Sequence, residues 1–225
     1  MMDELTQALA EIDHHREICA IIIRGAGENF SAGVDVSAHT PDKVELMLTR
    51  FHAVISSLIN TKKITIATVR GSCLGGGAEL AMICDLVYTS ESAQWGFPEI
   101  KLGCYPPVAC VALSTLVGQK NAADLILTGR NITGNEAAAM GLATRAVPDQ
   151  QLETTVEGVI ENLTQLSSAA LATTKKAIYV WDAMHFDKGL ARAEKIYLEE
   201  LIKTEDAREG IAAFLEKRKP RWEGR

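Results

Sequence analysis

The chain has 225 residues, of which 47% are hydrophobic and 23% are charged, and its formal net charge at pH 7 is −6. This length suits one large domain or a core with a smaller helical appendage, and the apolar fraction is sufficient for a buried core without disulfides or metals. The acidic balance argues against nucleic acid as the main partner, because phosphate binding needs a basic face.

The first hundred residues alternate helical and strand patterns. Apolar residues at helical spacing predict amphipathic helices over 2–13 and 41–58. Short apolar runs predict buried strands over 18–23, 64–69 and 85–88. The glycines at 75–77 open a further short helix, and we interpret Asp85 as the cap of a helix end or strand start. Buried strands that alternate with helices indicate an α/β fold with a mostly parallel sheet.

From about residue 107 onward the pattern is nearly all helical, with one more strand predicted at 143–147. Four helical patterns complete the chain, over about 150–165, 167–182, 186–203 and 205–218. There is no internal repeat, low-complexity segment or linker. We therefore expect an α/β core over 1–150 that is continuous with a C-terminal helical region over 151–225.

The start of the chain and its cysteines are typical of a cytoplasmic protein. The N-terminus is acidic and polar, unlike a signal peptide, and no apolar run approaches the ~20 residues that span a membrane. The five cysteines lack the spacing of a zinc site, and we interpret them as small buried hydrophobic residues in a reducing compartment. The five histidines lie outside the motifs described next, and we expect surface or structural roles for them.

Two glycine-rich turns follow two of the predicted strands, over 25–35 and 71–80. Consecutive glycines at a helix start let ligand atoms approach the backbone, and free N–H groups there favour developing negative charge. The triplet at 75–77 is not followed by Lys-Ser/Thr, which argues against a phosphate-binding P-loop. Phe30 stands where a dinucleotide site would need its third glycine. Each turn alone is also compatible with a purely structural role.

Together with their flanks, the two turns resemble the crotonase superfamily of enoyl-CoA hydratases and isomerases. The matching stretches, in the order and spacing of that family, are FSAGVD (30–35), GSCLGGGAELAMICD (71–85), AQWGFPEIKLG (93–103), LTGRNITGNEAAAMGL (127–142) and EDAREGIAAFLEKRKP (205–220). The resemblance implies a crotonase-like core of repeated ββα units arranged in a spiral, followed by a C-terminal helical region. Members of the family normally begin with a β-hairpin, and we expect that hairpin to be missing before the helix that starts here at Met2.

The resemblance also implies catalytic roles. The amides of Val34 and Gly76 would form an oxyanion hole for a thioester, and Glu79 and Glu99 would act as an acid/base pair. Hydration of a C=C bond requires one group that takes a proton from water and one that delivers a proton to the α-carbon, which two carboxylates can do. Neighbouring carboxylates also push their pKa values apart, which keeps one protonated near neutrality. For a single glutamate in the first turn of a helix, capping of the helix dipole is the alternative.

We expect the substrate, an acyl-CoA thioester, to contact the two turns and the residues that flank Glu99. These candidates are Ala32, Gly33, Asp35, Val36, Leu74, Gly75, Trp95 and Tyr105. For Trp95, a place in the buried core is equally compatible with the sequence. Because CoA is part of the substrate, no separate cofactor and no metal is expected.

The loop after Glu99 departs from that of ordinary enoyl-CoA hydratases, which have a glycine-rich stretch with a Thr-Gln-Arg element. Here it reads Leu102-Gly103-Cys104-Tyr105-Pro106-Pro107-Val108-Ala109. The two prolines stiffen the turn, and Tyr105 and Val108 add bulk that disfavours a long straight acyl chain. The stretch resembles the cyclohexa-1,5-diene-1-carbonyl-CoA hydratases, which implies hydration of a cyclic dienoyl thioester.

Other functions remain open at this point. They are a general short-chain enoyl-CoA hydratase, an enoyl-CoA isomerase, and a crotonase-like binding or regulatory protein, against which the acidic balance and the glutamate pair argue. The family assembles as trimers or dimers of trimers. The resemblance therefore implies a homotrimer or hexamer in which residues 151–225 form much of the contact.

Overall fold

The computed structural model traces residues 1–225 and describes every side chain except those of residues 180–184. Its strands are β1 (Ala20–Arg24), β2 (Ile64–Val69), β3 (Ser72–Leu74), β4 (Leu86–Ser90), β5 (Gln94–Gly96), β6 (Asn131–Thr133) and β7 (Arg145–Val147). Its α-helices are α1 (Met2–Asp13), α2 (Val44–Asn60), α3 (Gly76–Met82), α4 (Pro107–Val117), α5 (Gln119–Thr128), α6 (Gly134–Met140), α7 (Leu152–Thr164), α8 (Ser168–Glu199) and α9 (Glu205–Leu215). The short 3₁₀ helices are η1 (Val36–His39), η2 (Pro98–Leu102), η3 (Asp149–Gln151) and η4 (Leu201–Lys203).

The strands form two small sheets, and the chain crosses between them several times. One sheet has the order β1-β2-β4-β7 and is parallel throughout. The other has the order β3-β5-β6, with β3 parallel to β5 and β5 antiparallel to β6. The chain runs from β2 through β3 into α3, and later from β4 through β5 towards α4. Both of these passages place one strand in each sheet before a helix, which confirms the predicted α/β fold of repeated ββα units.

The longer strands follow their apolar sequence patterns, whereas the strands of the second sheet have no recognisable pattern in the sequence. All six residues of β2 are buried, as expected for a strand between two parallel neighbours. The strands β3, β5 and β6 have three residues each, and this is too short for any periodicity to stand out. The apolar patterns therefore located the strands of the parallel sheet but none of the strands of the second sheet.

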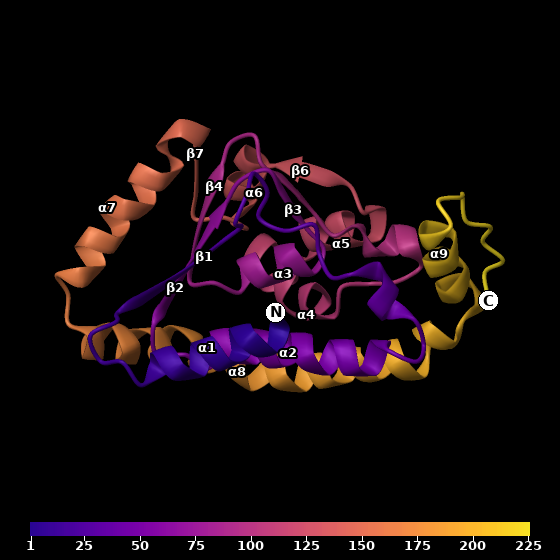
Figure 1. The fold of residues 1–225 in the computed structure, drawn as a ribbon, viewed down its shortest axis with the longest axis horizontal. Helices are drawn as coiled ribbons and strands as arrows, with labels where there is room; N and C mark the ends of the chain where they lie inside the picture. The colour runs from indigo at the N-terminus through magenta and orange to yellow at the C-terminus, as the bar shows by residue number, and fades with distance from the viewer.

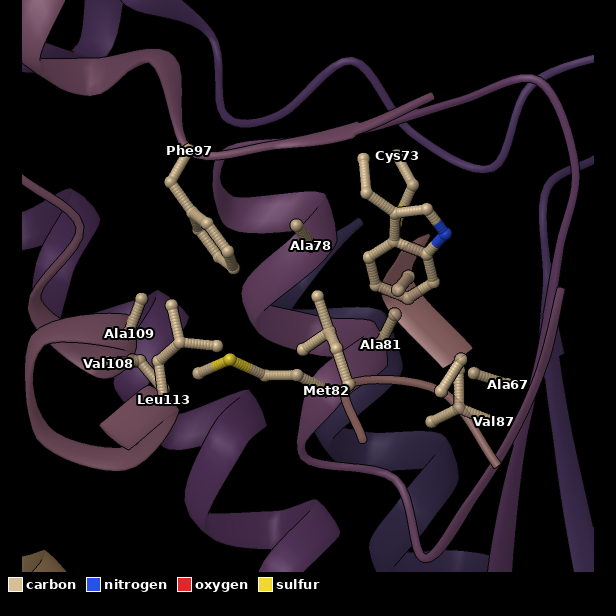
Figure 2. Close-up of a cluster of buried hydrophobic side chains, with 14 of the residues drawn as sticks. Ala67, Cys73, Ala78, Ala81, Met82, Val87, Phe97, Val108, Ala109 and Leu113 are labelled. Atoms are coloured by element: carbon tan, nitrogen blue, oxygen red, sulfur yellow. The ribbon is translucent and has the colours of Figure 1, made fainter. Parts of the chain in front are cut away.

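Helix α3 lies at the centre of the hydrophobic core. Its residues Ala78, Ala81 and Met82 are buried and pack in one cluster with Phe97 and Leu113 (Figure 2). Six of its seven residues are buried. A short helix enclosed in this way is held by tertiary packing, since its own length could not stabilise it.

The long helix α8 runs along the base of the molecule beside α2 and packs against α4 (Figure 1). It is one continuous helix where the sequence predicted two, over 167–182 and 186–203, so the predicted interruption between them was wrong. None of the described helices combines the length and the apolar character needed to cross a bilayer.

A buried ion pair ties α8 to the parallel sheet. The Lys175 ammonium lies 2.8 Å from Oδ2 of Asp85, with only 6% and 10% of the two side chains exposed. The same Asp85 oxygen accepts hydrogen bonds from the backbone N–H and the hydroxyl of Thr65 on β2. Asp85, which the sequence suggested as a simple cap, thus joins β2, β4 and α8.

Candidate active site

A cavity of about 440 Å³ collects residues from distant parts of the chain. This volume lies within the ~300–1,000 Å³ typical of small-molecule pockets. Ten of the residues singled out from the sequence line it, namely Ala32, Gly33, Val34, Val36, Leu74, Gly75, Gly76, Glu79, Glu99 and Tyr105. The spiral fold brings them together, because the turns that follow β1, β3 and β5 lie side by side.

Two of the singled-out residues lie elsewhere. The Asp35 side chain caps η1 by accepting a 2.9 Å hydrogen bond from the amide of Ser37, and it borders a neighbouring groove. Trp95 is fully buried in the main core, where its indole N–H donates a 3.0 Å hydrogen bond to the Thr89 hydroxyl. Of the two interpretations of Trp95, the core position is therefore the one the structure has. Trp95 holds β5 in place just before the segment that carries Glu99.

The turn between β3 and α3 has a backbone that only glycine adopts readily. Gly75 has φ +54° and ψ −130°, and its amide donates a 2.9 Å hydrogen bond to the carbonyl of Gly96. A Cβ atom at this position would lie 2.8 Å from Oε1 of Glu99. The turn thus approaches the Glu99 carboxyl as closely as a backbone can.

Val34 and Gly76 both line the cavity, and their backbone amides have no acceptor among the described residues. Neither N–H donates a hydrogen bond to another group in the described part of the chain. The two residues are neighbours, since a Cβ atom on Gly76 would lie 2.7 Å from Cγ2 of Val34. Two free N–H groups beside a cavity can stabilise an oxygen atom on which negative charge develops.

Glu79 belongs to the first turn of α3, and its side chain is buried beside the cavity. Only 3% of the residue is exposed. Burial, followed by the negative charge of Glu99, raises the pKa of Glu79, and hydrogen bonds from the amides of Val108 and Ala109 only partly offset this. The Ala109 amide donates to Oε1 of Glu79 at 2.9 Å.

Glu99 reaches the same cavity from η2. Its Oε2 atom is buried and has no hydrogen-bond partner among the described residues, and burial raises the pKa of this carboxyl as well. No basic side chain in the described part of the chain forms an ion pair with Glu79 or Glu99. Two buried carboxyls without a cation titrate near neutrality, so together they can hold one proton and exchange it with a bound molecule.

Other side chains that the sequence did not single out also line the cavity. They include Met47, Leu48 and Phe51 of α2, Tyr197 of α8, and Phe214 of α9. Met47, Leu48, Phe51 and Tyr197 lie outside the family-matching stretches, whereas Phe214 belongs to the matching stretch over 205–220. His39 also borders the cavity, and burial lowers its pKa. No group of three or more potential metal ligands was found among the described residues.

Comparisons with known proteins agree with this geometry. A family model described as enoyl-CoA hydratase/isomerase matches residues 1–225. A protein of Rhizobium meliloti named "Probable enoyl-CoA hydratase" is 39% identical over 228 aligned positions, which cover 100% of this chain and 88% of its own. The cyclohexa-1,5-dienecarbonyl-CoA hydratase of Thauera aromatica is 34% identical over 225 positions, covering 100% of this chain and 87% of its own. A crystal structure of an enoyl-CoA hydratase from Mycobacterium avium subsp. paratuberculosis superimposes with a TM-score of 0.88 at 27% identity, covering 98% of this chain and 87% of that chain.

Proposed function

Because the chain belongs to the enoyl-CoA hydratase/isomerase family, we propose that it adds water across the double bond of an α,β-unsaturated acyl-CoA thioester. The observation that carries this proposal is the cavity itself. The proposal is supported by four residues that line this cavity: Glu79 and Glu99, with their buried carboxyls, and Val34 and Gly76, whose amides have no acceptor among the described residues. A hydratase requires these two kinds of groups at one site.

The proposed reaction uses each group once. The thioester carbonyl oxygen accepts hydrogen bonds from the amides of Val34 and Gly76. The ionised glutamate takes a proton from water, and the water oxygen forms a bond to the β-carbon. The π electrons move towards the carbonyl oxygen, where the two amides stabilise the enolate. The other glutamate, which is protonated from the start, then delivers its proton to the α-carbon. This step restores the carbonyl and leaves a β-hydroxyacyl thioester.

The acyl group of the proposed substrate is compact, with a cyclic dienoyl thioester as the specific candidate. The wall after Glu99 supports this, because Tyr105, Pro106 and Pro107 all line the cavity. Two consecutive prolines restrict the backbone there, so this part of the wall cannot move easily to admit a larger acyl group. The name of the Thauera aromatica relative agrees with a cyclic dienoyl substrate. A short linear enoyl-CoA is the alternative substrate.

The test compares hydration of crotonyl-CoA and cyclohexadienoyl-CoA by the purified protein and by Glu79→Gln and Glu99→Gln variants. Each substitution should lower kcat by ~10²–10⁴-fold while binding of the thioester is retained, because a glutamine side chain has the shape of glutamate but cannot take up or release a proton. Glu157→Gln, an exposed change on α7, is the matched control and should leave activity unchanged. Unchanged turnover in both active-site variants would refute the acid/base pair. A strong preference for crotonyl-CoA would refute only the cyclic substrate.

A further inference from the structure

Tyr197 lines the cavity although it belongs to the C-terminal helical region. It lies near the end of α8, in the region expected only to form subunit contacts, and yet it borders the same cavity as Glu79 and Glu99. Only 1% of the residue is exposed. The C-terminal region therefore contributes directly to the wall of the site.

The ring of Tyr197 is held firmly by its neighbours. It meets the ring of Tyr105 edge to face, with 5.2 Å between centroids and an angle of 70° between the planes. Tyr105 is itself anchored, because its hydroxyl donates a 2.5 Å hydrogen bond to the carbonyl of Ala193 on α8. The two rings pack in a cluster of buried apolar residues that includes Met47 and Leu48 of α2. An aromatic side chain enclosed on these sides cannot swing away to admit a longer ligand.

The hydroxyl of Tyr197 does not account for this position. It is buried and has no hydrogen-bond partner in the described part of the chain. The thiol of Cys104 lies nearby, but it donates its own proton to the carbonyl of Leu102, and its sulfur is only a weak acceptor. Packing of the ring, and not hydrogen bonding, therefore fixes Tyr197, and a phenylalanine would occupy the same volume.

We propose that Tyr197, braced by Tyr105, is the specificity-determining residue that limits the length of the acyl group. The pair contributes two packed rings to the cavity wall, one from α8 and one from the loop after Glu99. Compact or cyclic acyl groups fit in front of the rings, whereas a long straight chain meets them. This inference rests on the proposed function, since it describes the acyl pocket of that hydratase.

The experiment measures kcat/KM for crotonyl-, hexenoyl- and octenoyl-CoA with the unmodified protein, Tyr197→Leu and Tyr197→Phe. The unmodified protein should favour crotonyl- over octenoyl-CoA by about tenfold or more in kcat/KM, because extra acyl methylene groups that do not fit the pocket lower kcat/KM by a factor of that order. Tyr197→Leu should raise the relative rate on octenoyl-CoA by about tenfold. Tyr197→Phe should keep the original preference, because it keeps the ring. Relaxed selectivity in Tyr197→Phe, or unchanged selectivity in Tyr197→Leu, would overturn the proposal.

Binding measurements separate this inference from the proposed function. Butyryl-CoA and octanoyl-CoA are saturated and cannot be hydrated, so calorimetric titration reports the shape of the pocket alone. Tyr197→Leu should bind octanoyl-CoA more tightly than the unmodified protein does, and Tyr197→Phe should not. If no variant hydrates any enoyl-CoA, the proposed function fails, and the titrations still decide the role of Tyr197. A thermal unfolding curve confirms that each variant is folded.

Discussion

Oε1 of Glu79 accepts a 2.9 Å hydrogen bond from the amide of Ala109, so the first turns of α3 and α4 meet at this carboxyl. The contact has two consequences. It orients the carboxyl and partly stabilises its ionised form, but it supplies no full positive charge and does not offset the effect of burial on the pKa of Glu79. The acid/base character of the site therefore depends on how two helices from successive turns of the spiral are packed.

Activity should depend on pH in a bell-shaped manner. Burial raises the pKa of Glu99 to about 7, and burial together with the Glu99 charge raises that of Glu79 to about 8. The reaction requires one ionised and one protonated carboxyl, and this form of the pair is most populated between its two apparent pKa values. We expect kcat/KM for crotonyl-CoA to rise towards neutral pH and to fall in mildly alkaline solution. A profile that is flat from roughly pH 6 to pH 9 would contradict the pair as proton carriers.

Replacing Glu79 should stabilise the fold in alkaline solution. The folded-state pKa of about 8 lies above the ordinary value of 4.5, so the folded protein binds the proton more tightly than the unfolded chain. The contribution of this proton to the free energy of unfolding is fully present below the pKa of Glu79 in the unfolded chain. It is lost as pH rises through the pKa of Glu79 in the folded protein. Since each pKa unit corresponds to about 1.4 kcal/mol, Glu79→Gln should increase the free energy of unfolding by at least ~1 kcal/mol at alkaline pH. Urea unfolding at acidic and alkaline pH measures the difference, which Glu157→Gln should not show.

A methyl group at Gly76 should impair catalysis more than folding. The new Cβ would lie 2.7 Å from Cγ2 of Val34 and would push apart the two residues whose amides face the cavity. Loss of one such donor typically lowers kcat by ~10²–10³-fold, and we expect Gly76→Ala to approach this range. Gly27→Ala is the matched control, because a Cβ at Gly27 would meet no atom within 4 Å. Near-normal kcat in a folded Gly76→Ala protein would argue against an oxyanion hole at this position.

Breaking the buried ion pair should strongly destabilise the protein. Lys175→Met would leave Asp85 buried without its cation, and removal of one partner from such a pair costs about 3–5 kcal/mol. Lys195→Met breaks an exposed pair with Glu199, whose side chains are each 57% exposed, and should cost less than ~1 kcal/mol. Chemical unfolding of both variants measures the contrast. Equal effects of the two substitutions would show that the Asp85 pair contributes no more than a surface pair.

Much of the candidate site could be predicted from the sequence, because its residues fall in short, contiguous motifs. The glycine turn before Glu79 and the segment around Glu99 are local signals, and their residues do line one cavity. Trp95 shows the limit of this reasoning. It stands four residues before Glu99, but β5 turns its side chain into the core, and only the pairing of the second sheet decides that direction.

The sequence by itself determined the family resemblance, the alternation of strands and helices, and the candidate glutamates and amides, since each is encoded over a few neighbouring residues. The tertiary structure alone decided what surrounds them. It brought Tyr197 from α8 against Tyr105, paired Lys175 with Asp85, and placed the Ala109 amide on Glu79. These contacts join residues far apart in the chain, and their formation depends on the packing of whole helices. No local pattern reports that packing, because an apolar helix face carries no information on which partner it will meet.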